Sequence, residues 1–308
     1  MKSIIEAGNL KGKRVLLRVD WNVPMENGKV IDDFRIRKSL PTLEYLKNAG
    51  AKVIVATHLE PEGTSVEPLR VYVPAGMELL ENLRDNLGEE NNSEEFARKL
   101  SDNADIFVNE AFSASHREHA SIVGVPKYLP HYAGLGFTEE AEALSKAFDP
   151  PHPFLLILGG AKFETKLPLV QKFINIADEI FIAGAIAKPA SEMPFATNPK
   201  IIFPIGDIAA LDANEETLEN CKLKIESSKF ILWNGPLGKY EEGYKEGTIK
   251  LARMLAESGK ETIIGGGDTL AVIKELNLYD KFSFVSTGGG AMLTYLATGT
   301  LPGIEALH

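Results

Sequence analysis

The chain has 308 residues, 44% of them hydrophobic and 25% charged, which is the composition of an ordinary globular protein and allows two domains of about 150 residues each. Its formal net charge of −10 argues against nucleic-acid and acidic-membrane partners, because both require a basic surface. Because the one cysteine, Cys221, excludes an internal disulfide, and no secretory signal or membrane-spanning apolar run is recognisable, we expect a cytoplasmic protein.

The beginning of the chain predicts parallel α/β structure. Residues 14–19 and 52–57 are apolar runs typical of buried strands, and Asn27-Gly28 marks a turn between them. The helix expected before the second strand ends near Gly50 and carries an apolar stripe of Leu40, Leu43 and Leu46. A strand, a helix and a strand in this order indicate a parallel sheet.

The segment after the second strand has no clear periodic pattern of apolar residues. Residues 60–73 are expected to be irregular because they contain or adjoin three prolines, Pro61, Pro68 and Pro74. Residues 77–84 fit either a strand or the start of a helix, and the acidic residues 85–95 predict a surface loop. Residues 105–109 predict another strand, which delivers residues 110–121 to the same sheet edge.

A proline-rich break lies near the middle of the chain. Residues 138–148 predict a helix capped by Thr138, and residues 149–153 (DPPHP) end it. We expect this helix and break to connect two domains, with the boundary between residues 147 and 148.

The second half predicts a doubly wound parallel sheet, because strands and helices alternate along it. Apolar runs typical of strands lie at residues 154–158, 179–183, 200–204, 229–233, 261–265 and 282–286. Helical segments are expected at about residues 164–176, 213–222, 248–258 and 270–275.

Four glycine-rich loops follow strands of the second half. In the first, residues 154–166 (FLLILGGAKFETK), two glycines precede Lys162 and Lys166, which are one helical turn apart. The others are residues 234–238 (NGPLG), 265–269 (GGGDT) and 287–290 (TGGG). Loops that leave parallel strands meet at one edge, and glycines and helix N-termini there favour phosphate, so the four loops predict one shared nucleotide-sized site.

The first half carries a second candidate site, for an anion. Guanidinium groups match phosphate or carboxylate with two hydrogen bonds, although a lone surface arginine is usually solvated. Asp20 and Asn22 either bind a hydroxylated ligand or cap the turn after the first strand, and we expect His116 and His119 to make local hydrogen bonds rather than a zinc site. The cationic side chains expected at strand ends are Arg18, Arg35, His58, Arg84 and Arg117.

Asp268 follows three glycines at the expected phosphate edge. Phosphate would repel this carboxylate unless a divalent cation lay between them, so Asp268 predicts Mg²⁺; the alternative is a helix cap. Glu241 either accepts a hydrogen bond from a ribose hydroxyl or belongs to a solvated acidic pair with Glu242. The Walker A and dinucleotide-binding patterns are both absent, which argues against P-loop and dehydrogenase folds.

Eight segments, in the same order as in that family, resemble phosphoglycerate kinase. They are KRVLLRVDWNVP (13–24), DDFRIRKSLPTLEYL (32–46), ENLR (81–84), VNEAFSASHREHAS (108–121), ILGGAKFETK (157–166), WNGPLGKYEEG (233–243), TIIGGGDT (262–269) and STGGGAMLTYL (286–296). The resemblance implies two Rossmann-like domains joined by a hinge helix. Residues 1–147 would bind the triose phosphate, 148–290 the nucleotide, and 291–308 would pack back on the first domain.

The resemblance also implies an activity and its residues. A hinge-bending monomer would transfer a phosphoryl group reversibly from 1,3-bisphosphoglycerate to Mg-ADP, giving 3-phosphoglycerate and ATP. The triose would be bound by Asp20, Asn22, Arg35, His58, Arg84 and Arg117. The nucleotide would be bound by Gly160, Lys162, Lys166, Gly184, Asn234, Pro236, Glu241, Gly266, Gly267, Asp268 and Thr269, with Asp268 on Mg²⁺. The catalytic groups would be Arg35, Lys162, Gly267 and Gly290.

Two departures from the family pattern affect the expected substrate sites. Where the family has H-L-G-R-P, residues 58–62 read HLEPE, so one phosphate-binding arginine is missing. Losing a charge-assisted contact costs about 1.5–3 kcal/mol, or roughly ten- to a hundredfold in affinity, which predicts weak triose binding unless Arg70 substitutes. Residues 183–186 (AGAI) replace a glycine-richer G-G-G-M and the helix after them is short, which predicts an altered adenine pocket.

Three functional hypotheses remain open at this point. The first is an active phosphoglycerate kinase, favoured by the joint presence of Arg35, Lys162, Lys166 and Asp268. The second is a non-catalytic nucleotide- or triose-binding relative with a regulatory role. The third is a kinase for another acyl phosphate.

Overall fold

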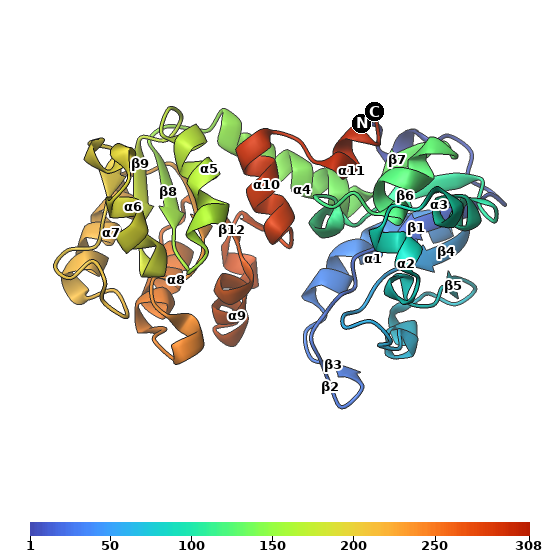
Figure 1. Cartoon of the computed structure of the whole chain (residues 1–308), viewed down its shortest axis with the longest axis horizontal. Coiled ribbons are helices and arrows are strands. Elements are labelled where there is room, and N and C mark those ends of the chain that lie inside the picture. Colours follow the sequence, from blue (N-terminus) through green and yellow to red (C-terminus); the bar gives the residue numbers. More distant parts are fainter. The chain divides into compact units, whose positions relative to one another are not determined.

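The computed structural model describes residues 1–308, which divide into two compact units. One is Met1–Glu142 with Thr300–His308, and the other is Ala143–Gly299 (Figure 1). The division thus falls slightly before the predicted boundary. The returning segment begins at Thr300 rather than at residue 291, because Gly290–Thr298 forms helix α10 within the second unit. No helix has the length and apolar character needed to cross a membrane.

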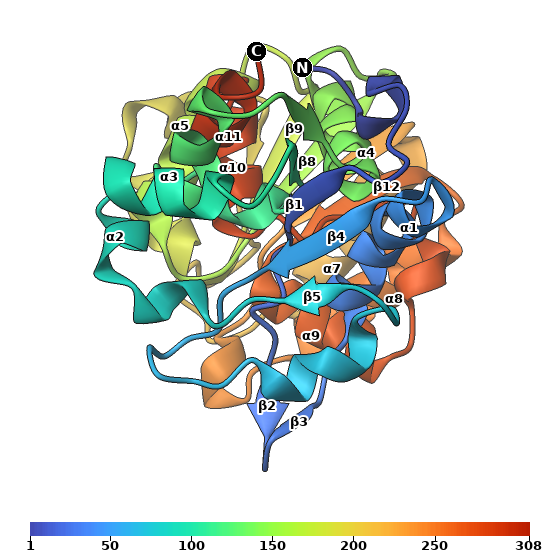
Figure 2. The ribbon, with the colours of Figure 1, turned by 90° about the vertical axis from the view of Figure 1, so that its right-hand side faces the viewer.

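The first unit is built on a five-stranded parallel sheet in the order β5-β4-β1-β6-β7. Figure 2 shows β1, β4 and β5 side by side. The order reverses next to β1, so the loops after β1, β4 and β6 open on one edge, where ligands bind in such sheets. The strands are β1 (Arg14–Arg18), β4 (Lys52–Ala56), β5 (Glu78–Leu79), β6 (Ile106–Asn109) and β7 (His131–Ala133).

Helix α1 (Phe34–Asn48) connects β1 to β4, as the apolar stripe predicts, and buries Leu43 and Leu46. Before it, β2 (Met25–Glu26) and β3 (Lys29–Val30) form a hairpin that protrudes from the first unit (Figure 2). Its turn is the predicted Asn27-Gly28, whose φ angles of 49° and 71° suit these two residue types.

The predicted surface loop over residues 85–95 is wrong. The segment forms α2 (Leu87–Glu90) and the start of α3 (Glu94–Ser101). The side chain of Asn86 accepts a hydrogen bond from Gly88 N at 2.8 Å, and that of Ser93 accepts one from Phe96 N at 3.4 Å, so each helix is capped. Among the polar residues only Glu89 is buried, whereas Asp85, Glu90, Asn91, Glu94 and Glu95 are exposed.

The helix predicted over residues 138–148 begins earlier, as α4 (Leu135–Ser145). Thr138 therefore does not cap it; its hydroxyl donates to Gly134 O at 2.9 Å. The first amides of α4 instead meet the buried carboxylate of Glu110, whose oxygens lie 2.9 Å from Gly136 N and 3.3 Å from Phe137 N. A Cβ on Gly134 would lie 1.6 Å from Glu110 Oε2, so only glycine leaves room for this contact.

Glu110 gives the folded protein a pH-dependent stability. Burial raises the pKa of Glu110 from 4.5 to about 8, against the smaller opposing effect of the two amides. Between these pH values the folded state holds a proton that the unfolded state has lost, so stability should fall by about 1 kcal/mol per unit as pH rises. Urea unfolding at several pH values measures this slope. Glu110→Gln should flatten it, and an unchanged slope in that variant would assign it to other groups.

The second unit is built on a six-stranded parallel sheet in the order β10-β9-β8-β11-β12-β13, as the alternating pattern predicts. The strands are β8 (Phe154–Leu158), β9 (Glu179–Ile182), β10 (Ile201–Ile202), β11 (Phe230–Asn234), β12 (Glu261–Gly265) and β13 (Phe284–Val285). The helices are α5 (Phe163–Phe173), α6 (Ala187–Ser191), α7 (Glu215–Ser227), α8 (Glu246–Glu257), α9 (Gly267–Glu275) and α10. Strand order reverses between β8, whose five residues are all buried, and β11.

Short helical turns occupy much of the remaining chain. A π-helical turn spans Ala120–Gly124. The 3₁₀ turns are Ile4–Glu6, Glu67–Tyr72, Leu83–Asp85, Phe112–Ala114, Val125–Lys127, Lys146–Phe148, Gly184–Ile186, Pro194–Thr197, Tyr240–Glu242 and Tyr279–Lys281.

Residues beyond Thr300 complete the first unit. Helix α11 (Pro302–Glu305) is tied to it by a hydrogen bond from Gly303 N to Ser115 O of 2.9 Å. The first and last residues also meet, with the Met1 ammonium 3.1 Å from His308 Nδ1.

Candidate active site

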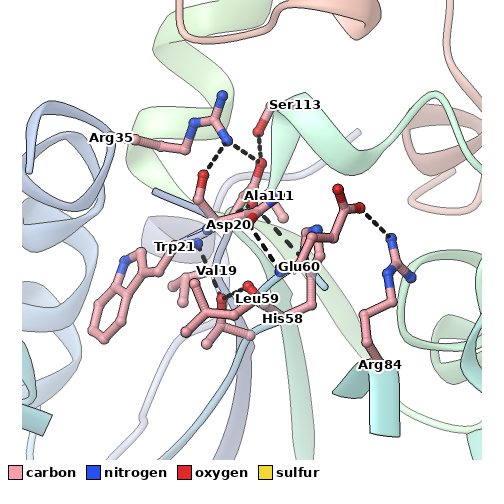
Figure 3. Close-up of polar contacts among 12 residues, drawn as sticks. Val19, Asp20, Trp21, Arg35, His58, Leu59, Glu60, Arg84, Ala111 and Ser113 are labelled. Atoms are coloured by element: carbon pink, nitrogen blue, oxygen red, sulfur yellow. Dashed lines mark hydrogen bonds and ion pairs between the residues drawn. The ribbon is translucent and has the colours of Figure 1, made fainter. Parts of the chain in front are cut away.

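In the first unit, Asp20 is the centre of a polar cluster at the reversal of strand order (Figure 3). Its Oδ2 lies 3.2 Å from Arg35 NH1 and accepts a hydrogen bond from Ser113 Oγ. Arg35 NH1 also donates to Asn22 O at 2.9 Å. Burial opposes the ionisation of Asp20, but Arg35 and the Ser113 hydroxyl outweigh it and hold the pKa of Asp20 below its usual value. Asp20 is therefore an anion that fixes the Arg35 guanidinium.

His58, directly after β4, is held as a neutral imidazole. Its Nδ1 lies 3.1 Å from Arg18 NH2, and since arginine can only donate, Nδ1 accepts and the proton is on Nε2. Burial and then the charge of Arg18 lower the pKa of His58 to about 3. His58 can thus offer one N–H donor to a ligand at any physiological pH.

Arg18 does not belong to the anion-binding cluster, and the prediction that it would is wrong. It is fully buried, its Nε donates to Ser121 Oγ at 2.8 Å, and its NH1 donates to Val19 O. The buried Glu89 lies 3.9 Å away as its counter-ion. Arg18 therefore holds His58 in place from inside the unit.

Arg84 and Arg117 form the other part of the first-unit cluster. Arg84 follows β5 and is buried, with NH1 3.1 Å from Nδ1 of His119. Burial and then Arg84 lower the pKa of His119 to about 4, so this histidine is neutral. Its hydrogen bond reaches a residue 35 positions away rather than a local group, and the buried Nδ1 of His116 has no hydrogen-bond partner. The Nε and NH2 groups of Arg84 have no hydrogen-bond partner, although Glu90 Oε1 lies 3.1 Å from Nε.

Glu60 extends a carboxylate toward both arginines. Its Oε1 is 3.8 Å from Arg84 NH2, a contact visible in Figure 3, and 3.5 Å from Arg117 NH1. Arg70, the candidate substitute for the missing arginine, is instead paired with Glu67 at 2.8 Å on its own 3₁₀ turn.

Two predicted positions differ in detail from the expectation. Arg35 comes from the first turn of α1, and Arg117 lies in the loop after β6, so neither follows a strand directly. Asn22 accepts two hydrogen bonds. Its backbone carbonyl accepts one from Arg35, and its side-chain Oδ1 accepts one from Glu60 N at 3.2 Å. Asn22 therefore joins the two parts of the cluster.

In the second unit, the four glycine-rich loops surround one cavity of about 400 Å³, as the sequence predicts. The predicted residues that line it are Gly160, Lys162, Lys166, Asn234, Pro236, Glu241, Gly266, Gly267, Asp268 and Gly290. A smaller hollow of about 130 Å³ shares several of these residues and adds Ala185, Gly238, Lys239 and Tyr240.

Three helices begin at the wall of the larger cavity. Lys162 precedes α5, Gly266 precedes α9 and Gly289 precedes α10, and all three line the cavity. Helix N-termini carry partial positive charge and unpaired N–H groups, which stabilise phosphate. The helix N-termini therefore add partial positive charge to a cavity whose side chains include two lysines and two carboxylates, Glu241 and Asp268.

Lys166 is a buried cation on this wall. The residue is 7% exposed, and its ammonium, which is not fully buried itself, makes no ion pair with a carboxylate. Burial lowers the pKa of Lys166, Asp268 partly offsets this, and Lys162 adds to the lowering. An anion in the cavity would pair with the Lys166 ammonium and offset the free-energy cost of burying its charge.

Asp268 lies in the first turn of α9, one residue past its start, and lines both hollows. The alternative in which Asp268 caps the helix is wrong, because Gly266 holds the cap position. Glu241 also lines both hollows, and its carboxylate is not paired with a cation.

Three residues predicted to bind the nucleotide also make contacts within the protein. The Thr269 hydroxyl is fully buried and accepts from Gly235 N at 3.0 Å. Gly160 lines the cavity, but its N–H donates to Pro236 O at 2.8 Å and is not available to phosphate. Gly184 lies behind it, where a Cβ would come within 2.9 Å of Gly160 N. These residues shape the loops.

Several functional neighbours were missed from the sequence. Ser113 and Glu89 acquire their roles only through partners distant along the chain, and no local pattern marks them. Glu60 lies in the departing segment HLEPE, but its contacts with the two arginines were not predicted. Gly289 had a signal, since it belongs to the fourth glycine-rich loop.

Comparison with known proteins identifies relatives along nearly the whole chain. The family model described as phosphoglycerate kinase matches residues 5–73, 68–193 and 190–299. A phosphoglycerate kinase of Borreliella afzelii is 33% identical over 390 aligned positions, covering 100% of this chain and 99% of the relative. One from Borrelia garinii subsp. bavariensis is 34% identical over 394 positions, with the same coverage. Both alignments are longer than this chain, so gaps fall within it.

Two solved structures have the same architecture. Phosphoglycerate kinase from Coxiella burnetii superposes with a TM-score of 0.86 at 31% identity, covering 99% of this chain and 98% of the other. Phosphoglycerate kinase from Pyrococcus horikoshii OT3 gives a TM-score of 0.87 at 28% identity, covering 100% and 98%.

Proposed function

Since this chain belongs to the phosphoglycerate kinase family, we propose that its two polar sites divide one phosphoryl-transfer reaction between them. The enzyme is a phosphotransferase of glycolysis that transfers a phosphoryl group between 1,3-bisphosphoglycerate and ADP, giving 3-phosphoglycerate and ATP. The observation that carries the division is Lys166, a largely buried residue whose ammonium has no carboxylate partner and lines a cavity walled by helix N-termini.

The first-unit cluster is proposed to bind the triose. Asp20 and Asn22 can accept hydrogen bonds from its hydroxyl, and neutral His58 can donate one to its carboxylate through Nε2. Arg84 and Arg117 supply positive charge for its phosphate. Arg35, held by Asp20 and Asn22 O, is proposed to stabilise the group in transfer.

The second-unit cavity is proposed to bind the nucleotide phosphates. Lys162, Lys166 and the start of α9 at Gly267 and of α10 at Gly290 would cancel negative charge on the phosphate oxygens. The smaller hollow beside Pro236 and Glu241 would take the nucleoside, with Glu241 accepting from a ribose hydroxyl. Ala185 on its wall is where the altered loop would affect base binding.

The residues of the cavity fit Mg²⁺. This ion usually keeps several waters and is held by one or two carboxylates together with substrate phosphates. Asp268 supplies such a carboxylate beside the phosphate site, and no group of three metal-ligating side chains is needed or present. When bound, Mg²⁺ would shield the charge of the nucleotide phosphates.

Catalysis then requires position and charge cancellation more than proton transfer. The carboxylate of the triose attacks the phosphoryl group in one direction and leaves it in the other. Because a carboxylate is already ionised, no general base is needed. Because the reacting oxygens have to come into contact, the proposal includes a hinge motion between the two units that excludes water. We also propose a cytoplasmic monomer; the single cysteine, Cys221, which is buried, supports the location.

A coupled assay with ATP, 3-phosphoglycerate and Mg²⁺, run to high triose concentration, tests this function. Saturable turnover that needs all three components is expected. Absence of turnover in a folded protein that binds nucleotide would favour the non-catalytic alternative, and turnover only with another carboxylate would favour the third hypothesis.

Asp268→Asn tests the metal assignment. We expect the Mg²⁺ concentration for half-maximal turnover to rise about tenfold, because one anionic ligand becomes neutral. Asp280→Asn is the matched control, since Asp280 is exposed and lies outside both hollows. An unchanged Mg²⁺ requirement in the Asp268 variant would contradict the assignment.

A further inference from the structure

Glu60 stands where the proposed triose site should be most positive. The carboxylate reaches both arginines of the cluster from a backbone that is fixed on its N-terminal side. Glu60 N donates to Asn22 Oδ1 at 3.2 Å, and Leu59 N and O are both bound by Asn82, at 3.1 Å and 2.9 Å. The position of Glu60 beside the arginines is therefore built into the fold.

Arg84 is paired in charge by Glu60 and Glu90, but its hydrogen-bonding groups are not satisfied by either carboxylate. It is 6% exposed, and its Nε–H and NH2 groups are buried without a hydrogen-bond acceptor. These two groups form the edge of a guanidinium that binds carboxylate or phosphate with two parallel hydrogen bonds. Leaving them unsatisfied costs free energy, so the site favours an incoming anion.

The Glu60 carboxylate satisfies this edge only in part. At 3.8 Å from Arg84 NH2 and 3.5 Å from Arg117 NH1 it neutralises charge without a hydrogen bond to either. The Glu60 side chain is 51% exposed, so it can rotate into solvent. It is a removable counter-ion rather than a structural partner.

The charges of the site balance without a ligand. Arg84 and Arg117 face the carboxylates of Glu60 and Glu90, while His119 is neutral because burial and Arg84 lower its pKa to about 4. A phosphate dianion entering here has more charge and more oxygens than Glu60, so it can replace it, but it has to break the two ion pairs of Glu60 and compete with Glu90 for the Nε group of Arg84.

We propose that Glu60 is an internal ligand of Arg84 and Arg117 that the phosphate of the triose displaces, and that it thereby sets the affinity of the enzyme for phosphorylated substrates. The inference rests on the proposed triose site. Glu60 lowers affinity for 3-phosphoglycerate, whereas it has little effect on glycerate, the same carboxylate without the phosphate. Glu60 is thus a specificity-determining residue.

Glu60→Gln tests the inference, with Glu62→Gln as the control. Glu62 is an exposed neighbour without an ion pair, so its replacement makes the same change in net charge. For Glu60→Gln we expect the KM and the calorimetric Kd of 3-phosphoglycerate to fall about tenfold, with kcat and the KM of ATP within about twofold. The Kd of glycerate should not change, and Glu62→Gln should change none of these values.

Each other outcome is decisive. Unchanged or weaker binding of 3-phosphoglycerate by Glu60→Gln would mean that Glu60 positions the arginines, and equal tightening by Glu62→Gln would mean a general charge effect; either overturns the inference. The binding measurement does not depend on turnover. A wild-type chain that binds 3-phosphoglycerate but does not phosphorylate it would refute the proposed function and leave the role of Glu60 to be decided by Kd.

Discussion

Replacing Lys166 by methionine is expected to abolish nucleotide binding and at the same time to stabilise the ligand-free protein. Methionine is unbranched and apolar, so it fills the same space on α5 without a charge. The residue is largely buried and its ammonium has no carboxylate partner, and burial lowers the pKa of Lys166, so the charged form is disfavoured. Its removal should raise the free energy of unfolding by about 1 kcal/mol.

The same substitution removes a charge-assisted contact to phosphate. We expect ATP affinity to fall about a hundredfold and turnover to fall at least as much. Calorimetry with ATP and urea unfolding without it measure the two effects. Lys172→Met is the control: Lys172 is on the same helix, outside the cavity, with its ammonium 4.2 Å from the centre of the Phe148 ring. This control should bind ATP normally and lose a little stability.

The opposite signs of the two effects make the prediction specific. Loss of both affinity and stability in Lys166→Met would show that Lys166 mainly holds α5 in place. Retained affinity would place the phosphates elsewhere in the cavity.

Arg35→Lys is expected to lower kcat by about a hundredfold or more while the KM of either substrate changes little. Arg35 is oriented by two contacts of one nitrogen, to Asp20 Oδ2 and Asn22 O, which leaves the planar guanidinium in a fixed plane. A lysine ammonium keeps the charge but loses this geometry, so charge stabilisation in the transition state suffers more than ground-state binding.

Arg37→Lys is the matched control for Arg35. Arg37 is two residues further along α1, exposed and paired with Asp33 at 2.9 Å. Its replacement should leave kcat within about twofold. A value of kcat for Arg35→Lys within threefold of the wild type, with a raised triose KM, would make Arg35 a binding residue only.

The sequence was most informative where burial determines structure. The run Phe154–Leu158 is fully buried, and such runs followed by glycines predicted both the sheet of the second unit and the loops around its cavity. Because the carboxyl ends of parallel strands lie at one edge of a sheet, residues from four distant loops could be predicted to lie close together. It needs no knowledge of side-chain partners.

The errors arose where a partner distant along the chain decides the outcome. Arg18 resembles the other cations in sequence, and only Glu89 and Ser121 show that it turns inward. Residues 85–95 are polar enough for a loop, but short helices capped by Asn86 and Ser93 form there, and Glu89 accepts a hydrogen bond from Ser121 N inside the unit. Glu60 was recognised as a departure, yet its contacts with two arginines depend on tertiary structure.

The segment Thr300–His308, which completes the first unit, has a consequence for folding during synthesis. Ribosomes add about 5–20 residues per second, and the whole second unit is translated between Glu142 and Thr300. For roughly ten to thirty seconds the nascent first unit therefore lacks α11 and the hydrogen bond from Gly303 to Ser115. The second unit, whose residues are contiguous, can reach its native state before the unit that is synthesised ahead of it.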